Sequence, residues 1–399
     1  MNKILYVHYQ KNANEGSTVH VSRFASAFSR ICQGQSIDFE VVAPEVVFVV
    51  PDQRPKTAGG RLKQWLAKYY LRDIKVLLRQ IVNAYRERAM LKKKRPDVVL
   101  TRYDAETLSI HWACRSLNIP VLTEFNGRDR QELAGTYLDY KQLTLVNRIL
   151  GNCNALNWSV GAMAVSDAIA DDLRACNQSG KPVIVNHNGV DLAEFDSNLS
   201  GKALRQQLNT PDGALVVGYI GSFIIWHSPE RLFRAFQRLL ATNVDAYLLL
   251  VGPKLPGVEA MINACGPELV RRVRYVGFVH HEDIPKYLAM MDIAVLPNTQ
   301  AYCSPLKLFE YMAMAKACLV PATSTIQSIL VDGKEGLLFD PASEEAFIEG
   351  LIRLAHDEAL RCQLGEAARK RVEAEFTWDH NAERVMQLIQ DGLAWKQKN

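Results

Sequence analysis

The amino-acid sequence predicts two α/β domains in one chain, each built on a doubly wound parallel sheet. Short apolar runs alternate with stretches of helical periodicity along most of the 399 residues. The alternation is interrupted once, by a polar stretch that contains the turn Thr210-Pro211-Asp212-Gly213, and then it starts again. Strands that alternate with helices are typical of βαβ units with right-handed crossovers, so two such series indicate two sheets.

The first half of the chain contains six apolar runs with the length of buried strands. We predict strands at 3–8, 39–43, 98–103, 119–127, 162–165 and 182–186. Helical periodicity between them predicts helices at 19–31, 61–95, 105–118, 135–154 and 166–176. Glu124 closes one strand and should lie at the carboxyl edge of the sheet, where parallel sheets bind ligands. It is a candidate cleft residue, with a loop cap as the alternative.

The loop that follows the first strand holds Gly16, and the first turn of the next helix holds His20. A strand, a glycine-containing loop and a helix form a βα unit that can approach a phosphate. One glycine is far short of a dinucleotide fingerprint, so Gly16 is either a phosphate-loop residue or a plain turn glycine. His20 either lines a cleft or is an ordinary helix residue.

The second half of the chain repeats the pattern. We predict strands at 215–222, 247–252, 273–279, 293–297, 317–320 and 336–340. We predict helices at 229–241, after Pro256, and at 281–291, 305–315, 343–356, 358–376 and 379–396. The first domain is placed at 1–195 and the second at 196–378, and the C-terminal segment 379–399 is expected to pack back on the first domain.

Composition narrows the class of protein. Apolar residues make up 48% and charged residues 23% of the chain, which is ordinary for a globular protein. Eight scattered cysteines without a C-x-x-C pair argue against a disulfide scaffold or a structural zinc site and fit a reducing cytosol. The first residues read as a strand rather than a signal peptide, and no apolar run reaches the roughly 20 residues that span a bilayer. We therefore expect a cytoplasmic protein.

Positive charge is concentrated in one segment. Between Arg54 and Arg95 the chain carries fourteen Lys and Arg against two acidic residues, Asp73 and Glu87. The helix predicted at 61–95 is amphipathic and basic, which suits the anionic inner face of a membrane. The alternatives are a solvated basic face on a helix packed against a sheet and, with less support, a nucleic-acid site.

The stretch at 293–321 reads as a strand, a polar loop, a helix and a second strand. Ser304 suits the N-cap of that helix and Pro305 its first residue, which leaves first-turn amides directed at the loop. The positive charge of Lys307 opposes the helix dipole there, and a bound phosphate would explain a lysine at this position. Glu310 follows one turn later. The alternative is that Lys307 and Glu310 form a surface ion pair.

Several motifs together resemble the retaining glycosyltransferases of family 4, whose GT-B architecture has two Rossmann-like domains facing across a cleft. The resemblance covers about half the chain well and the N-terminal domain only in outline. Its pieces are NHNGVDLAEF, GYIGSFIIWHSPERLFRAF, VGFVHHEDIPKYLAMMDIAVLP, SPLKLFEYMAMAKACLVP and GKEGLLFDPASEEAF.

The resemblance implies a role for individual residues. Glu310 matches the second glutamate of the family's E-x7-E motif, which accepts hydrogen bonds from the donor ribose. Lys307 and the amides near Ser304, Pro305 and Leu306 would contact the diphosphate or the sugar. The first glutamate of the motif is replaced by Tyr302, so the sequence is closer to a subgroup with S-P-x-K-x-x-E.

The resemblance also places residues of the first strand of the second domain. The loop at Gly221 and Ser222 should approach the phosphates, and His227 is its prominent polar group, in a W-H-G-like sequence where Ser228 replaces glycine. A nucleotide diphosphate can leave with stabilisation from cations and helix amides, so no metal and no bound cofactor are expected. Glu124 is a possible acceptor-side group.

The predicted function is transfer of a sugar from a nucleotide-sugar donor, with retention, to a glycan or a lipid-linked glycan in cell-surface polysaccharide or glycoconjugate synthesis. The enzyme would be peripheral on the membrane through the helix at 61–95. The alternatives are a sugar-nucleotide epimerase or hydrolase on the same fold and a nucleic-acid-binding protein. The last leaves the motifs of the second half unexplained, so we do not expect nucleic acid as a partner.

Overall fold

The computed structural model describes residues 1–9, 16–44, 72–103, 107–128, 149–223 and 227–399. The chain forms two compact units. The first comprises Met1–Asn12, Val21–His187 and Ala382–Asn399, and the second comprises Ala13–His20 and Asn188–Asn381. The chain therefore passes more than once between the units, and its last residues belong to the first.

The first unit is built on a six-stranded parallel sheet with the order β2-β1-β3-β4-β5-β6. Its strands are β1 (Lys3–Val7), β2 (Asp38–Val42), β3 (Val98–Arg102), β4 (Val121–Phe125), β5 (Gly161–Ala164) and β6 (Val183–Val185). The central strands are buried along nearly their whole length, as parallel strands covered on both faces must be. The chain leaves β1 first toward β2 and then toward β3, so β1 and β3 mark the switch point of this sheet.

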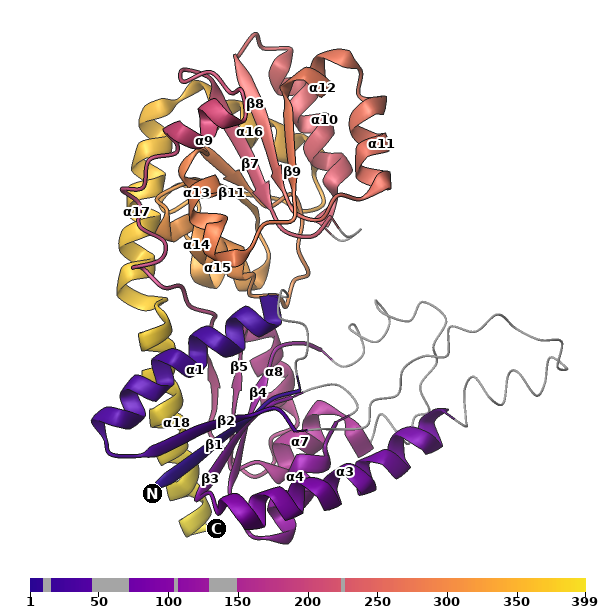
Figure 1. Cartoon of the computed structure of the whole chain (residues 1–399), viewed down its shortest axis with the longest axis vertical. Helices are drawn as coiled ribbons and strands as arrows, with labels where there is room; N and C mark the ends of the chain where they lie inside the picture. The colour runs from indigo at the N-terminus through magenta and orange to yellow at the C-terminus, as the bar shows by residue number, and fades with distance from the viewer. Residues whose placement is uncertain (10–15, 45–71, 104–106, 129–148, 224–226) are drawn as a thin grey trace, which may run out of the picture. The chain divides into compact units, whose positions relative to one another are not determined.

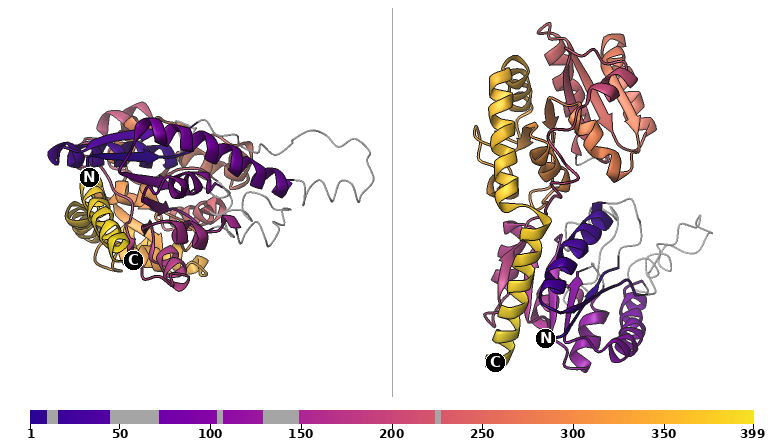
Figure 2. Two further views of the ribbon diagram at one scale, coloured as in Figure 1. Left: turned by 90° about the horizontal axis from the view of Figure 1, so that it is seen from below. Right: turned by 60° about the vertical axis from the view of Figure 1, so that its left-hand side comes forward.

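Right-handed crossovers place the helices of the first unit on opposite faces of its sheet (Figures 1 and 2). The helices are α1 (Gly16–Gly34), α3 (Arg72–Lys94), α4 (Ser109–Ser116), α7 (Asn152–Trp158), α8 (Asp167–Ala175) and the C-terminal α18 (Trp378–Lys398). The helix predicted at 135–154 falls mostly outside the described residues. In α18, Gly392 allows close approach to the backbone of Val160, because a Cβ there would come 3.1 Å from the Val160 carbonyl oxygen.

The second unit has a parallel sheet of its own, with the order β12-β11-β10-β7-β8-β9. Its strands are β7 (Leu215–Ile220), β8 (Ala246–Val251), β9 (Val273–Gly277), β10 (Ile293–Val295), β11 (Ala317–Pro321) and β12 (Leu337–Phe339). The chain runs outward from β7 to β9 and returns to β10 on the other side of β7. The switch point therefore lies between β7 and β10, and the two sheets confirm the predicted fold class.

Ten helices of the described chain follow or connect the strands of the second unit. They are α9 (Lys202–Gln207), α10 (Pro229–Leu240), α11 (Pro256–Ala264), α12 (Pro267–Arg272), α13 (Ile284–Ala289), α14 (Leu306–Ala313), α15 (Ser324–Ile329), α16 (Glu344–His356), α17 (Glu358–Glu375) and the short 3-10 helix η3 (His281–Asp283). The sequence did not predict α9, α12 or α15. Each has six residues, and helices this short are stabilised by packing rather than by propensity.

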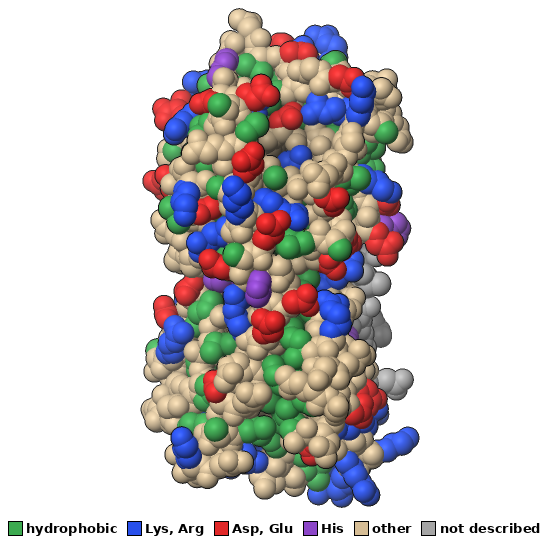
Figure 3. All heavy atoms as spheres, turned by 90° about the vertical axis from the view of Figure 1, so that its left-hand side faces the viewer, with side chains coloured by type: hydrophobic (Ala, Val, Ile, Leu, Met, Phe, Trp, Pro, Cys, Tyr) green, Lys and Arg blue, Asp and Glu red, His purple; other side chains and the backbone are tan. Residues whose placement is uncertain are grey.

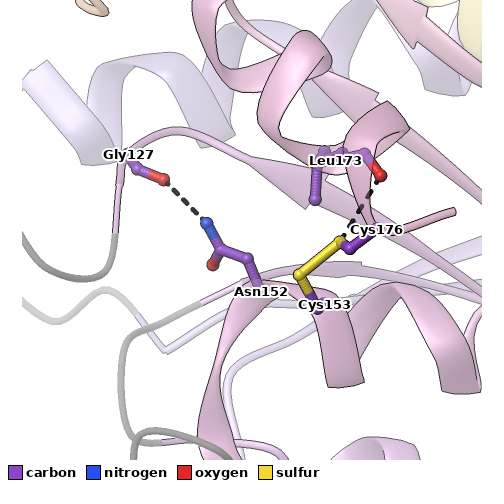
Figure 4. The surroundings of a disulfide bond; sticks show 5 residues. All are labelled: Gly127, Asn152, Cys153, Leu173 and Cys176. Carbon is purple, nitrogen blue, oxygen red and sulfur yellow. Dashed lines mark hydrogen bonds between the residues drawn. A yellow bond between two sulfur atoms is a disulfide. The ribbon is translucent and has the colours of Figure 1, made fainter.

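A disulfide joins Cys153 in α7 to Cys176 at the end of α8 (Figure 4). The scattered cysteines argued against a disulfide scaffold, and this single bond was not predicted from the sequence. The two cysteines lie 23 residues apart, and only the crossover through β5 brings their Cα atoms to 5.8 Å. Beside the bond, the Asn152 side chain donates to the Gly127 carbonyl at 3.4 Å.

In the described part of the chain, no helix combines the length and the apolar character needed to cross a bilayer. The helix predicted at 61–95 is described from Arg72 onward, as α3. Part of its apolar row faces solvent, whereas an amphipathic helix packed on a sheet would turn that row toward the protein. Ile74, Leu78 and Ile81 of its apolar row are exposed. The residues predicted to begin that row, at 62–70, lie outside the described residues.

Candidate functional site

The predicted anion site lies where the loop after β10 enters α14. The helix begins at Leu306, and Pro305 occupies its N-cap position with an extended backbone, φ −76° and ψ 122°. The prediction that Ser304 caps the helix is therefore wrong by one residue, because the ψ of Pro305 is extended and Pro305 thus precedes the first helical residue. The Leu308 amide donates to the Pro305 carbonyl at 3.0 Å, so the amides of Leu306 and Lys307 are the ones that precede any acceptor of the helix and could bind an anion.

Ser304 is held by a residue of the N-G-V-D segment. The Asn188 side chain donates to the Ser304 carbonyl at 2.6 Å, and the Asn188 amide donates to the Ser304 hydroxyl at 3.4 Å. His20 Nδ1 lies 2.7 Å from the Asn188 side-chain oxygen and donates to it. A hydrogen-bonded chain therefore runs from the first turn of α1 through Asn188 to the entrance of α14.

Gly16 completes this side of the site. A Cβ at Gly16 would come 3.5 Å from the Leu306 side chain, which is ordinary contact. Gly16 therefore lies next to the start of α14, although its position does not demand glycine for space. Tyr302, which replaces the family's first glutamate, is buried in the preceding loop.

Lys307 reaches from α14 to the end of β7. Its ammonium lies 3.1 Å from the Tyr219 hydroxyl and 4.6 Å from the centre of that ring. Gly221 has φ +138°, and a Cβ there would overlap the Lys307 ammonium. The positive φ favours glycine at 221, and a Cβ there would displace the flexible end of the Lys307 side chain.

Ser222 continues the same turn, and its carbonyl accepts a hydrogen bond from Tyr219 at 2.8 Å. Burial lowers the pKa of Lys307 to about 8, against an opposing contribution from the carboxylate of Glu310. A lysine with this pKa is a cation at neutral pH that is poorly solvated. Such a group gains more from an incoming phosphate than a hydrated surface lysine would.

Glu310 pairs with a histidine rather than with Lys307. Its side chain is buried, and His281 Nε2 lies 2.8 Å from its Oε1. On the other side, His281 Nδ1 lies 3.5 Å from Glu194 Oε1. Burial alone would lower the pKa of His281, but the hydrogen bond with Glu310 and the charge of Glu194 outweigh it and raise that pKa to about 9. The alternative of a surface pair between Lys307 and Glu310 is therefore wrong.

His227 lies near Lys307 across the switch point. Its Nδ1 is 3.2 Å from the Asn298 carbonyl, so this nitrogen carries the proton and donates. Burial, together with the nearby Lys307 charge, lowers the pKa of His227 to about 4, and the imidazole is neutral at pH 7. Ser228 follows with φ +49° and ψ 58°, a left-handed conformation that glycine adopts more readily than serine.

Glu124 belongs to the first unit and not to this cluster. It ends β4 and is buried, and both of its oxygens accept hydrogen bonds, from the Tyr6 hydroxyl at 3.2 Å and from the Asn126 side chain at 2.8 Å. A carboxylate at the carboxyl edge of a parallel sheet was predicted, and its hydrogen bonds hold it in one orientation.

Sequence reasoning missed three residues that organise the site: Asn188, Glu194 and His281. The first two lie in the NHNGVDLAEF segment, which the sequence marked only as a motif of the resemblance, and His281 lies in the helix predicted at 281–291, with no predicted role. Within the described ranges, no three His, Cys, Asp or Glu side chains are grouped so that they could hold a metal ion.

Comparison with known proteins matches both halves of the chain to glycosyltransferase families. The sequence model described as glycosyl transferases group 1 matches residues 201–371. The model described as glycosyltransferase family 4 matches residues 15–194. Together the two matches extend over most of both units.

Among curated relatives, a GDP-mannose-dependent monoacylated phosphatidylinositol monomannoside mannosyltransferase of Corynebacterium glutamicum is 26% identical over 51% of this chain and 55% of its own length. A D-inositol 3-phosphate glycosyltransferase of a Nocardioides species is 26% identical over 53% and 49%. The chain thus spans about half the length of these relatives.

Among solved structures, a sucrose-phosphate synthase of Thermosynechococcus elongatus superposes with a TM-score of 0.73 and 19% identity, covering 99% of this chain and 100% of that one. The Anabaena protein HepE, in complex with UDP and glucose, superposes with a TM-score of 0.68 and 16% identity, covering 98% and 100%. At these identities the likeness establishes the shared fold.

Proposed function

Because the chain belongs to the group 1 and family 4 glycosyltransferases, we propose that it transfers a sugar from a nucleotide-sugar donor to a glycan or lipid-linked glycan. The observation that carries this proposal is the placement of the Lys307 ammonium beside the start of α14 and the turn at Gly221. A buried cation and the amides at a helix N-terminus together suit a diphosphate. Glu310 lies one turn further along α14 and would accept hydrogen bonds from the ribose hydroxyl groups.

Related structures support a nucleotide sugar as the donor. The Anabaena HepE structures hold UDP, UDP with glucose, and UDP-glucose. We propose that residues 196–378 bind the donor in this chain, and that residues 1–195 bind the acceptor with Glu124 on the acceptor side.

In the proposed reaction, the bond between the sugar C1 and the leaving phosphate oxygen breaks, and the acceptor oxygen bonds to C1 from the same face. The acceptor proton passes to the leaving diphosphate. Lys307 and the α14 amides stabilise the negative charge that develops on the diphosphate, so neither a metal nor a nucleophilic carboxylate pair is required. Neutral His227 can position a polar group of the sugar or phosphate without adding charge.

A panel of nucleotide sugars tests this function. Purified protein is first screened with UDP-, GDP- and ADP-linked sugars by thermal shift. Acceptor-dependent release of the nucleoside diphosphate is then measured, and the anomeric configuration of the product is determined by NMR. A retained linkage on a glycan acceptor is the expected result, whereas epimerisation of the donor at C2 without transfer would support the alternative enzyme on this fold.

The acidity of Lys307 predicts an alkaline limit to donor use. The pKa of about 8 lies below the ordinary value of 10.5, so the cation is present below pH 8 and is lost as the pH rises through 8. The kcat/KM for the donor should therefore fall about tenfold per pH unit above this point, because kcat/KM reports the free enzyme. In Lys307→Met, the residual activity should no longer show the fall in kcat/KM near pH 8. If the fall persisted, it would be caused by the titration of another group.

We propose further that α3 lies on the inner face of an anionic membrane. Its solvent side carries a contiguous apolar row, exposed by between 48% and 76%: Ile74, Leu78, Ile81, Val82 and Tyr85. Exposed lysines and arginines flank this row, among them Lys75, Arg86, Lys92 and Lys93. A helix with an apolar row and a basic flank matches the boundary between anionic headgroups and acyl chains.

The orientation of α3 is fixed by its buried polar side. Gln80 accepts a hydrogen bond from the Leu108 amide at 2.9 Å, and Glu87 accepts one from the Tyr9 hydroxyl at 2.8 Å. Rotating the helix to bury its apolar row would leave these groups without those partners. The face seen in Figure 3 has acidic and basic side chains interspersed, and in the lower part of the view it also carries a group of hydrophobic side chains.

Replacement of Ile74, Leu78 and Ile81 by serine should weaken binding to phosphatidylglycerol-containing vesicles at least about tenfold, since each apolar side chain contributes on the order of 1 kcal/mol when it leaves water. Cosedimentation of the full chain with these vesicles measures the effect. The change lies on an exposed face, so donor hydrolysis in the absence of vesicles should be unchanged.

A matched control for the α3 test replaces exposed apolar residues of the second unit. Leu199, Leu255 and Val331 are each about 40% to 50% exposed, and their replacement by serine should leave vesicle binding intact. The membrane proposal would be contradicted if wild type and the α3 variant cosedimented equally with the vesicles. It would also be contradicted if the protein bound RNA instead of vesicles.

A further inference from the structure

We propose that His281 is a positioning residue, which holds the Glu310 carboxylate toward the donor ribose and is itself anchored by Glu194. The proposal rests on the proposed function and adds to it a histidine and a second carboxylate, neither of which contacts the substrate. Three chain segments supply the network: the loop before Phe195, the 3-10 helix η3 and the first turns of α14.

The geometry is that of one imidazole between two carboxylates. Nε2 of His281 lies 2.8 Å from Glu310, and Nδ1 lies 3.5 Å from Glu194. Side-chain exposure falls toward the site, from 25% for His281 and 15% for Glu194 to 9% for Glu310. A doubly protonated ring can donate to both sides, and it places a positive charge next to a carboxylate that is largely removed from water.

This charge lies next to the carboxylate that is proposed to accept hydrogen bonds from the ribose hydroxyl groups. His281 engages Oε1 of Glu310, so that Oε2 is the oxygen assigned to the ribose. Glu194 in turn favours the protonated ring, as the raised pKa of His281 shows.

The anchor is itself tied to the rest of the site. The ring of Phe195 packs edge-on against His281, with centroids 5.7 Å apart. The Phe195 carbonyl accepts a hydrogen bond from Arg369 Nη1 at 2.8 Å, and the same nitrogen donates to the Ala313 carbonyl at the end of α14. The segment that carries Glu194 and the helix that carries Glu310 are thus joined at two points, which limits their relative motion.

The test measures how strongly the protein senses the ribose hydroxyls. Among UDP, GDP and ADP, the nucleotide that shifts the melting temperature of wild type most is compared with its 2′,3′-dideoxy form by titration calorimetry. Wild type should bind the dideoxy form about 10- to 100-fold more weakly, as expected for hydrogen bonds to a charged group. In His281→Ala this ratio should fall below about 3, because a mispositioned carboxylate no longer distinguishes the two ligands.

Two controls separate positioning from general damage. His280 is the adjacent exposed histidine, and His280→Ala should keep the wild-type ratio. His281→Gln retains a donor without a charge and should give an intermediate ratio. If His281→Ala weakened both nucleotides equally and kept the ratio, its role would be structural and the proposal would be overturned. If wild type itself bound no nucleotide or showed no preference for the hydroxyls, the donor-site assignment would fail instead.

Discussion

Replacement of Lys307 by methionine is expected to lower kcat by about 10²- to 10³-fold, the effect of removing one preorganised group that stabilises charge in a transition state. Methionine has a similar length and no charge, so it leaves the space between α14 and the turn at Gly221 filled. The ammonium is poorly solvated in the unliganded protein, as its lowered pKa shows. Its removal should therefore leave the melting temperature unchanged or slightly higher.

The comparison for this variant is a lysine of the second unit that lies on the surface. Lys202 has a side chain that is 69% exposed and faces Asp212 at 3.9 Å, so Lys202→Met should have wild-type turnover. Steady-state kinetics at pH 7 compares the turnover of the two variants, and melting curves compare their stability. Turnover of Lys307→Met within a factor of three of wild type would remove this lysine from the phosphate site.

Replacement of Glu310 by glutamine is expected to lower kcat/KM for the donor about 10- to 100-fold, mainly through KM. The variant keeps the shape of the side chain, but the amide cannot accept hydrogen bonds with both ends, and a hydrogen bond to a charged group contributes about 1.5 to 3 kcal/mol. The loss should appear in KM because the ribose contact is present in the ground state and in the transition state alike.

A neighbouring carboxylate provides the comparison for Glu310. Glu282 is exposed in η3, next to His281, and Glu282→Gln should leave both kinetic constants unchanged. A fall in kcat at constant KM in Glu310→Gln would mean that this carboxylate acts in the chemical step rather than in donor binding. Wild-type constants would mean that it serves only to hold His281.

The course of the chain through both sheets was predictable because buried parallel strands read as short apolar runs. Stretches such as that of β8 have no other stable position in water than the interior of a sheet. The local structure of the proposed donor site was predictable for a different reason: Pro305, Lys307 and Glu310 lie within one short segment whose conformation is set by proline and by helical spacing.

The sequence did not predict which side of α3 packs against the rest of the protein. Periodicity shows that apolar residues share one side of this helix, but it does not show which side will meet the protein. The answer depends on Gln80 and Glu87, whose partners Leu108 and Tyr9 are supplied by other elements. A local pattern contains no information about partners that are distant in sequence.

By itself, the sequence determined the two α/β series, the family, and the cation and carboxylate of the proposed donor site. Each of these features follows from residues that lie close together in the chain. Only the tertiary structure decided that Glu310 pairs with His281 and Glu194 rather than with Lys307, and that Cys153 meets Cys176. Charge pairing and burial depend on distances in space, and crossovers between strands bring together segments that have no relation in sequence.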